Sequence, residues 1–321
     1  MDERKEISDD ELLRLAGKAC FKVSEEPHFD ADDAWKSFLR KHQRRNLYIK
    51  WASAAAVLLL VLVSVFAIMK YNPRPMTLFT AMKDIPQIIL IGEDDFSQVI
   101  TSTELDLTSH LYSRQRTYTI MTPVGKSLKV ILPDSSLVWM NAQSRVDYSR
   151  TDCREISLDG EAYFQVKRDE TSPFIVKVGE IKAKVLGTSF NIRGYSKEQM
   201  HITLLTGSLA LESDDDMSRI MEQGEDLTLQ QGDFLIRKID EVTEPLWTTG
   251  YFAFDDVPLY DLLCELGRWY NINVVALDKD VVQRRIHFKC SRSERIDSLV
   301  EILNSVGGFR IVHKGNTLFI Q

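Results

Sequence analysis

Residues 51–69 read WASAAAVLLLVLVSVFAIM, a run of 19 residues without a charged side chain. At about 1.5 Å per residue, a helix of this length extends roughly 28 Å, close to the roughly 30 Å of a bilayer's hydrocarbon core. A buried helix of a globular domain is the alternative, but such a helix normally carries a polar stripe, and only Ser53 and Ser64 interrupt this run. The sequence therefore predicts one transmembrane helix over residues 51–70.

The flanks of this run predict its orientation. Basic residues crowd its N-terminal side, and only Lys70 and Arg74 lie close on the other side. Because cytoplasmic flanks are enriched in basic residues, we expect the N-terminus in the cytoplasm and the C-terminal bulk outside it. A cleaved signal peptide does not fit, since about 50 highly charged residues precede the run. The N-terminal basic residues are Arg40, Lys41, Arg44, Arg45 and Lys50.

Residues 1–50 contain two short amphipathic patterns. The first follows Ser8 and Glu11, which have the spacing of a capping box. So small a segment lacks a sufficient core, and its apolar faces therefore favour a groove on a cytoplasmic partner. A helical anchor that lies on the membrane is the alternative. The candidate contact residues are Leu12, Leu15, Trp35, Phe38 and Leu39.

The composition of the 321 residues excludes several classes of protein. Hydrophobic residues make up 44% and charged residues 27%, which is ordinary for a folded chain. The net charge of -7 argues against direct nucleic-acid binding, because phosphates require a basic surface. The four cysteines form no CxxC pair, and the six histidines show no metal-binding spacing. No phosphate-binding loop or nucleophile elbow is present, so we expect no cofactor, no metal and no enzyme.

Short runs in which apolar and polar residues alternate dominate residues 118–245. They recur at near-regular spacing, separated by turn residues, which predicts an all-β domain, either a sandwich or a short solenoid. Asp159 and Gly160 stand between two such runs, and this dipeptide predicts a tight hairpin. Residues 71–117, with three prolines, are expected to form a linker and the first strands.

The pattern changes in residues 246–321. A strand over 252–254, a helix over 258–270 and a strand over 272–276 are followed by a second strand, helix and strand, with one further strand at 318–320. Two βαβ halves of this kind predict a small α+β domain.

Five ordered segments of the β region resemble the FecR family of transmembrane anti-sigma factors. They are TPVGKS (122–127), LPDSSLVWMNAQS (132–144), LDGEAYF (158–164), PFIV (173–176) and VLGTSFNI (185–192). The family usually has glycine after the aspartate of its LPDG turn, where this chain has Ser135.

The C-terminal region is similar to the domain that follows FecR in members found beside outer-membrane glycan-uptake systems. The matching segments are FAF (252–254), LGRWYN (266–271) and GNTL (315–318). The two resemblances imply that residues 1–50 hold an extracytoplasmic-function (ECF) sigma factor at the bacterial inner membrane. They also imply that the periplasmic region reads the state of a TonB-dependent outer-membrane transducer. Inner-membrane lipid and regulatory proteases are then further partners.

Many relatives are cut in steps, first outside the membrane and then within it. The Gly187–Thr188 bond is the candidate for self-cleavage, since a threonine hydroxyl can attack the preceding carbonyl and glycine offers no steric shield. A tight strand turn that needs Gly187 is the alternative. For the whole protein, the alternative function is a membrane-anchored periplasmic glycan-binding or structural module without sigma binding.

Overall fold

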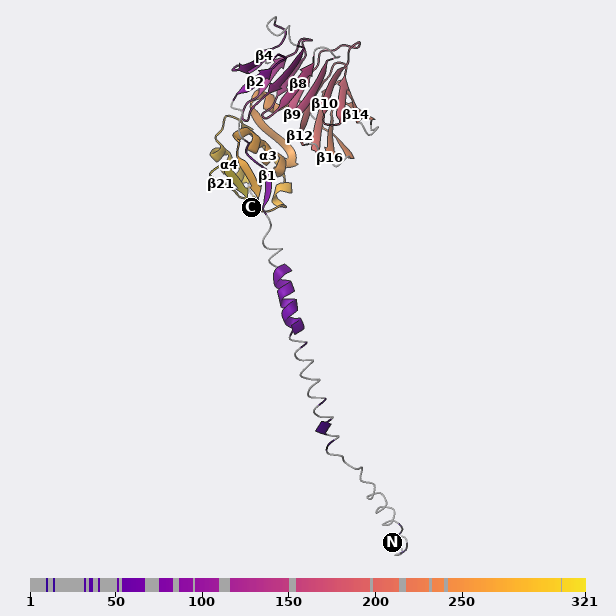
Figure 1. The fold of residues 1–321 in the computed structure, drawn as a ribbon, viewed down its shortest axis with the longest axis vertical. Helices are drawn as coiled ribbons and strands as arrows, with labels where there is room; N and C mark the ends of the chain where they lie inside the picture. Colours follow the sequence, from indigo (N-terminus) through magenta and orange to yellow (C-terminus); the bar gives the residue numbers. More distant parts are fainter. Residues whose placement is uncertain are drawn as a thin grey trace, which may run out of the picture. The chain divides into compact units, whose positions relative to one another are not determined.

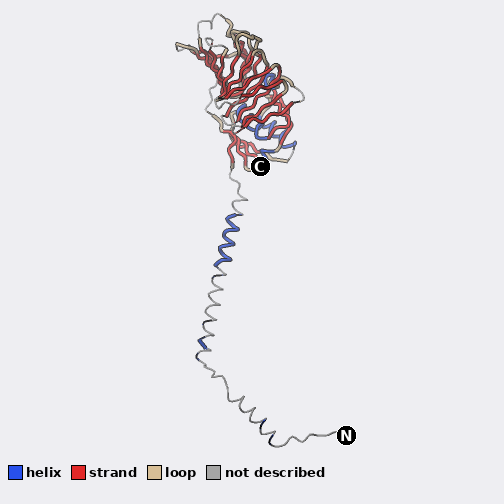
Figure 2. The backbone as a smooth tube through the Cα atoms, turned by 90° about the vertical axis from the view of Figure 1, so that its right-hand side faces the viewer, coloured by secondary structure: helices blue, strands red, loops and turns tan. Residues whose placement is uncertain are grey.

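A computed structural model describes residues 75–321, apart from 83–86, 95, 110–115, 150–153, 197–198, 214–217, 231–232, 240–241 and 307. Before residue 75 it describes residues 10, 14, 32, 35, 36, 40, 51 and 54–66. The chain divides into two compact units, Met1–Pro73 and Arg74–Gln321. Strands dominate the second unit, and its few helices are shown in blue in Figure 2.

Residues 54–66 of the first unit are helical, and their side chains are exposed. Leu60 is 66% exposed and Phe66 is 69% exposed. Within the residues described, no helix has both the length and the apolar character to cross a membrane. The transmembrane helix predicted over 51–70 includes residues 52, 53 and 67–70, which lie outside the described residues.

Sixteen strands form the β domain, which extends from residue 88 to residue 238. They are β2 Ile88–Ile91, β3 Ser97–Ile100, β4 Glu104–Asp106, β5 Thr117–Met121, β6 Leu128–Ile131, β7 Leu137–Met140, β8 Arg145–Ser149, β9 Glu155–Gln165, β10 Phe174–Val178, β11 Ile181–Val185, β12 Ser189–Ser196, β13 Gln199–Thr206, β14 Ser208–Ser213, β15 Ser218–Glu222, β16 Glu225–Gln230 and β17 Asp233–Lys238. One sheet has the order β3-β2-β5-β8-β9-β10-β11-β14-β15, and the other has the order β4-β6-β7-β9-β12-β13-β16-β17. Figure 1 labels β2, β8, β9, β10 and β14 of the first sheet and β4, β9, β12 and β16 of the second. The two sheets therefore share β9.

The predicted hairpin at Asp159–Gly160 is wrong, because both residues lie inside the single strand β9. Residues before Gly160 pair with β8 and β10, and residues from Gly160 onward pair with β7 and β12. Gly160 has φ 122°, and a Cβ there would lie 2.6 Å from the Cα of Ser144. Glycine is therefore needed where the strand passes from one sheet to the other beside Ser144, and not for a turn.

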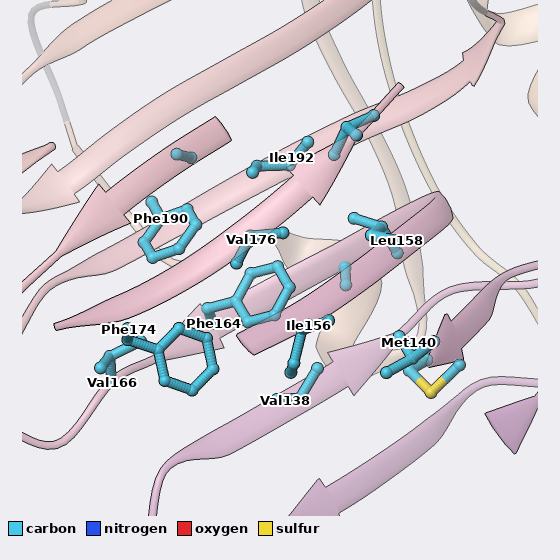
Figure 3. Packing of buried hydrophobic residues seen from close by; sticks show 14 of the residues in the cluster. Val138, Met140, Ile156, Leu158, Phe164, Val166, Phe174, Val176, Phe190 and Ile192 are labelled. Carbon is cyan, nitrogen blue, oxygen red and sulfur yellow. The ribbon is translucent and has the colours of Figure 1, made fainter. Parts of the chain in front are cut away.

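One hydrophobic core fills the β domain. Phe164 of β9 stacks on Phe190 of β12 at 4.9 Å between ring centroids, and Phe174 of β10 meets Phe164 edge-on at 6.2 Å (Figure 3). All three side chains are fully buried. Since side chains of both sheets enter one core, the domain corresponds to the sandwich, one of the two predicted alternatives.

The C-terminal domain contains β1 Met76–Phe79, η2 Leu246–Thr249, β18 Tyr251–Pro258, α3 Leu259–Tyr270, β19 Asn273–Ala276, η3 Val281–Gln283, β20 Arg285–Ser291, α4 Ile296–Val306, β21 Ile311–Lys314 and β22 Thr317–Ile320. The α+β class is as predicted, but the pairing differs from two βαβ units. The strands on either side of α3 belong to different sheets, since β18 pairs with β20 and β19 pairs with β22. The second sheet has the order β1-β19-β22-β21.

Strand β1 was expected to belong to a linker, but it forms an edge of the C-terminal sheet. It pairs antiparallel with β19, from Met76 opposite Ala276 to Phe79 opposite Val274, across 195 to 200 residues of sequence. The amide of Ala81 donates to Asn273 Oδ1 at 2.9 Å, and that of Met82 donates to Asn271 Oδ1 at 3.0 Å. Phe79 packs on Gly267 of α3, where an added Cβ would lie 2.5 Å from its ring. The segment that follows Pro73 is thus part of the C-terminal domain.

Replacing Ser135 with glycine should raise the free energy of unfolding by about 1 kcal/mol, because Ser135 has φ 67°, a left-handed conformation in which a Cβ is strained. Its amide donates to the Leu132 carbonyl in the β6–β7 turn at 2.9 Å. Urea unfolding of the full chain measures the change. Ser136→Gly is the control and should lower stability, since the Ser136 hydroxyl is buried and bonds Asp134 at 2.8 Å. Equal effects of the two changes would contradict this account of the turn.

Candidate functional site

Four buried polar side chains meet where the β domain contacts the C-terminal domain. Asn141 follows β7, Glu161 lies on β9, Glu265 lies on α3 and Arg292 follows β20. Their exposed fractions are between 0% for Asn141 and 6% for Glu161 and Arg292. Charged groups are seldom buried unless they are paired, so this interface cluster is costly unless each member finds partners.

Asn141 connects the other three members of the interface cluster. Its Nδ2 donates to Glu161 Oε2 at 2.7 Å and to Glu265 Oε1 at 3.0 Å. Its Oδ1 accepts from Arg292 Nη1 at 2.7 Å and from its neighbouring amide, that of Ala142, at 2.8 Å. The side-chain amide therefore uses both donors and both acceptor positions, and it fixes the two domains in one register.

Arg292 lies in an aromatic cage. Its Nη2 donates to Glu265 Oε1 at 2.8 Å, and only 4% of its side chain is exposed. The guanidinium carbon lies 4.4 Å from the ring centroid of Trp269 and 5.1 Å from that of Phe252. These faces attract the cation and exclude water from it. The arrangement strengthens the ion pair with Glu265 by lowering the local dielectric.

A second group of contacts joins β12 of the β domain to helix α3. Arg193 Nη2 donates to Asp261 Oδ1 at 2.5 Å. The guanidinium of Arg268 lies 3.8 Å from the ring centroid of Tyr195, and the Tyr195 hydroxyl donates to the Ala142 carbonyl at 2.7 Å. Helix α3 thus contributes to both groups of contacts between the C-terminal domain and the β domain.

The pKa values of the two carboxyl groups in the interface cluster are shifted in opposite directions. Burial and the charge of Glu265 raise the pKa of Glu161. Burial also acts to raise the pKa of Glu265, but Arg292, Arg268 and Arg193 outweigh it, and the net pKa is lowered. The Oδ1 of Asn191, which neighbours Glu161, has no hydrogen-bond partner among the described residues. A 180° turn of the Asn191 amide lets this oxygen accept a hydrogen bond from the protonated Glu161 carboxyl group.

We expect stability to fall as the pH rises above the ordinary glutamate value of 4.5. A raised pKa means that the folded protein binds the Glu161 proton more tightly than the unfolded chain does. The resulting stabilisation is complete when the pH is below the pKa of Glu161 in the unfolded chain. It is lost as the pH rises through the pKa of Glu161 in the folded protein. Tm measured between pH 4 and 8 should therefore fall less in Glu161→Gln than in the wild type. Glu180→Gln, in an exposed turn, should follow the wild type, and equal slopes for all three proteins would refute the assignment.

The Gly187–Thr188 bond lies in the connection from β11 to β12. Thr188 is 3% exposed, and its Oγ1 donates to the Ser208 carbonyl at 3.0 Å. Gly207 packs closely on the Gly187–Thr188 peptide bond. A Cβ on Gly207 would lie 2.9 Å from Thr188 Oγ1 and 3.2 Å from the Gly187 carbonyl oxygen. A Cβ on Gly187 would lie 2.5 Å from the Cα of Arg168. The Thr188 hydroxyl is therefore buried and hydrogen-bonded, and the backbone around the Gly187–Thr188 bond is closely packed.

Trp35 is the one predicted sigma-contact residue within the described part of the chain. It is helical and 60% exposed. Leu12, Leu15, Phe38 and Leu39 lie outside the described residues. Among described residues, no three His, Cys, Asp or Glu side chains gather as a metal site.

The interface cluster was not predicted from the sequence. Asn141 and Glu161 lie within the segments that resemble the FecR family, and no sequence pattern distinguishes Arg292. Asn141 is 124 residues from Glu265 and 151 residues from Arg292. No local spacing signals contacts at such separations. The available signal was a glutamate, Glu265, on the apolar face of a predicted amphipathic helix.

Comparisons with known families agree with this two-domain arrangement. Residues 118–210 match the family described as FecR protein, and residues 251–320 match the family described as FecR, C-terminal. The chain belongs to the FecR family of anti-sigma factors. This FecR-family chain is thus grouped with regulators and not with an enzyme family, and an anti-sigma factor implies a sigma factor as partner.

Two solved structures of a candidate anti-sigma factor from Parabacteroides distasonis ATCC 8503 are similar to this FecR-family chain. The one at 1.65 Å resolution is 26% identical, covers 63% of this chain and 98% of its own, and has a TM-score of 0.57. The one at 2.50 Å has the same identity and TM-score and covers 64% of this chain and 98% of its own. No curated protein matches the chain.

Proposed function

We propose that this protein is a single-pass inner-membrane anti-sigma factor. It sequesters an ECF sigma factor through residues 1–50 and relays a signal from a TonB-dependent outer-membrane transducer. Membership of the FecR family supports the anti-sigma role. The apolar, exposed helix at 54–66 and the basic residues before it support a span over residues 51–70 with the N-terminus in the cytoplasm.

The observation that carries the relay is the position of β1. This strand begins at Met76, close after the proposed span, and it pairs with β19 of the C-terminal domain. The C-terminal domain is therefore bound to the proposed membrane anchor through β1 as well as through the β domain. A transducer that contacts the C-terminal domain, for which the sheet edge β21 offers a strand-addition surface, would act on β1 through β22 and β19 of the same sheet.

The signal requires two states with different affinities for the transducer. The interface cluster supplies a discrete closed state, because Asn141 of the β domain contacts Glu265 and Arg292 of the C-terminal domain only when the domains are in register. A transducer that binds better to the separated domains shifts the population away from this state. Regulatory proteases then gain access to the chain.

We also propose that the chain cleaves itself at Gly187–Thr188 before the transducer signal arrives. Thr188 Oγ1 attacks the Gly187 carbonyl carbon, the C–N bond breaks, and the hydroxyl proton passes to the departing amine. Water then hydrolyses the ester and leaves a Gly187 carboxylate and the free Thr188 hydroxyl. The buried, hydrogen-bonded Thr188 hydroxyl supports this proposal.

Trp35→Ala should raise expression of the sigma-dependent genes at unchanged abundance of the protein. The reason is that large aromatic anchors dominate such interfaces, and Trp35 is 60% exposed. A reporter gene and an immunoblot measure the two quantities. Lys36→Ala, next to it and also exposed, is the matched control and should leave expression unchanged.

A pull-down tests the same proposal without transcription. The full-length protein in detergent is the bait for the native cytosol, with its Trp35→Ala variant as the control. Recovery of a sigma factor by the wild type alone would support the proposal. If neither protein recovers a sigma factor and expression does not change, a periplasmic binding or structural module becomes the better account.

A further inference from the structure

A polar cavity of about 220 Å³ lies where β1, the β domain and helix α3 meet. Leu78 of β1 forms one wall, Arg193 and Tyr195 of β12 form a second, and Asp261 and Arg268 of α3 form a third. This volume holds several water-sized groups and accommodates a small organic molecule. It lies beside the interface cluster but contains none of its four members.

Arg268 lines this cavity, and not all of its N–H donors have an acceptor among the described residues. A guanidinium has five N–H donors. The ion pair from Arg268 to Glu265 is long, at 3.5 Å, and Glu265 already pairs with Arg292 at 2.8 Å. Among the described residues, no other acceptor lies within hydrogen-bonding distance of Arg268. Its plane is fixed against Tyr195, so the guanidinium is held in place for a ligand.

The charges on the cavity walls favour a monoanion. Arg193 and Arg268 contribute two positive charges, and Asp261 contributes one negative charge, which leaves an excess of one positive charge. His201 adds no charge near neutral pH, because burial and Arg193 lower its pKa. A dianion such as phosphate would leave one buried negative charge uncompensated.

Neutral hydrogen-bonding groups line the rest of the cavity. His201 accepts or donates at Nδ1 with Thr228, but its Nε2 has no partner among the described residues. The charge of Cys264 and burial raise the pKa of Tyr260 to about 12, so its hydroxyl stays a donor. Such groups match the hydroxyls of a ligand.

We propose that this cavity binds a small hydroxylated monocarboxylate, whose carboxylate is held by Arg268 and whose hydroxyl groups contact His201 and Tyr260. Leu78 and α3 face the cavity together, so a bound acid contacts β1 and the helix at the same time. Binding to the folded protein alone also raises Tm.

Calorimetric titration of the full chain in detergent tests the site. The probe is D-glucuronate, and D-glucose is its neutral counterpart, which differs only by having CH₂OH in place of the carboxylate. We expect saturable binding of glucuronate, none of glucose, and weaker binding of inorganic phosphate. Arg268→Gln should weaken glucuronate binding at least about tenfold, and Arg295→Gln, with a side chain 85% exposed outside the cavity, should not change it.

A second measurement uses the wild-type protein and does not depend on the folding of a variant. Cys264 lines the cavity and Cys290 does not, so glucuronate should slow alkylation of Cys264 by N-ethylmaleimide and leave Cys290 unaffected. Lack of saturable glucuronate binding up to about 10 mM would overturn the proposal. Equal binding of glucose, tighter binding of phosphate, or unchanged binding by folded Arg268→Gln would also overturn it. Neither measurement involves a sigma factor, so both outcomes are independent of the proposed function.

Discussion

Replacing Arg292 with methionine should lower the free energy of unfolding by about 3 to 5 kcal/mol, the usual range when one partner of a buried ion pair is removed. Methionine keeps the length of the side chain and its contact with Trp269, but Glu265 loses its 2.8 Å partner and Asn141 Oδ1 loses a donor. Urea unfolding of the full chain, followed by tryptophan fluorescence, measures the change. Arg295→Met, at a side chain 85% exposed, should change stability by less than about 0.5 kcal/mol.

A double variant separates the loss of packing from the loss of charge balance. Removing Glu265 as well, as Glu265→Leu in the Arg292→Met background, leaves no uncompensated carboxylate at that position. The double variant should therefore recover part of the loss, and the coupling energy should exceed about 1 kcal/mol. If the two substitutions are additive, the interface cluster is not the cooperative unit described above.

Thr188→Ala should convert the protein from two fragments, cut after residue 187, into one chain of full length. The substitution removes the nucleophile and also costs the hydrogen bond to the Ser208 carbonyl and a buried methyl group, each worth about 1 kcal/mol, so the domain should still fold. Immunoblots with tags at both ends of the chain measure the outcome. Thr188→Ser keeps a hydroxyl and should still be cut.

Thr171→Ala is the matched control for this change. Thr171 is exposed, and its hydroxyl bonds Asp169 in a surface turn at 2.7 Å, so the variant should be cut like the wild type. Two fragments of unchanged size from Thr188→Ala would rule out self-cleavage by this residue. Gly187 would then serve only the close approach of its backbone to Arg168.

Strands in which apolar and polar residues alternate could be predicted from the sequence. The strand pairings that depend on residues far apart in the sequence could not. Residues 128–132 and 137–140 alternate between buried and less buried positions, and they form β6 and β7 as expected. The β9 hairpin was wrong because Asp-Gly is a turn signal only when the flanking strands pair with each other. Here the two halves of β9 pair with four other strands, and that choice depends on the whole domain.

Strand β1 and the interface cluster also could not be predicted, because both depend on contacts between residues far apart in the sequence. MTLF (76–79) follows Pro73 and Pro75, which indicate a connector, and its partner β19 lies about 200 residues away. The family resemblance identified the segments that contain Asn141 and Glu161, but it did not indicate that these side chains meet α3. Long-range polar contacts of this kind leave no periodic pattern, because each requires only one residue at one position.

A chain cut in the β11–β12 connection would still be held together by strand pairing. The first piece would keep β1 to β11, and the second would keep β12 to β22. Among the described strands, three ladders would then join separate polypeptides: β9 with β12, β11 with β14 and β1 with β19. Each piece supplies strands to both domains, so the pieces complement one another as an interleaved heterodimer. Its lifetime would be set by the rate of unfolding, and peptide-bond hydrolysis alone would not release the anchor.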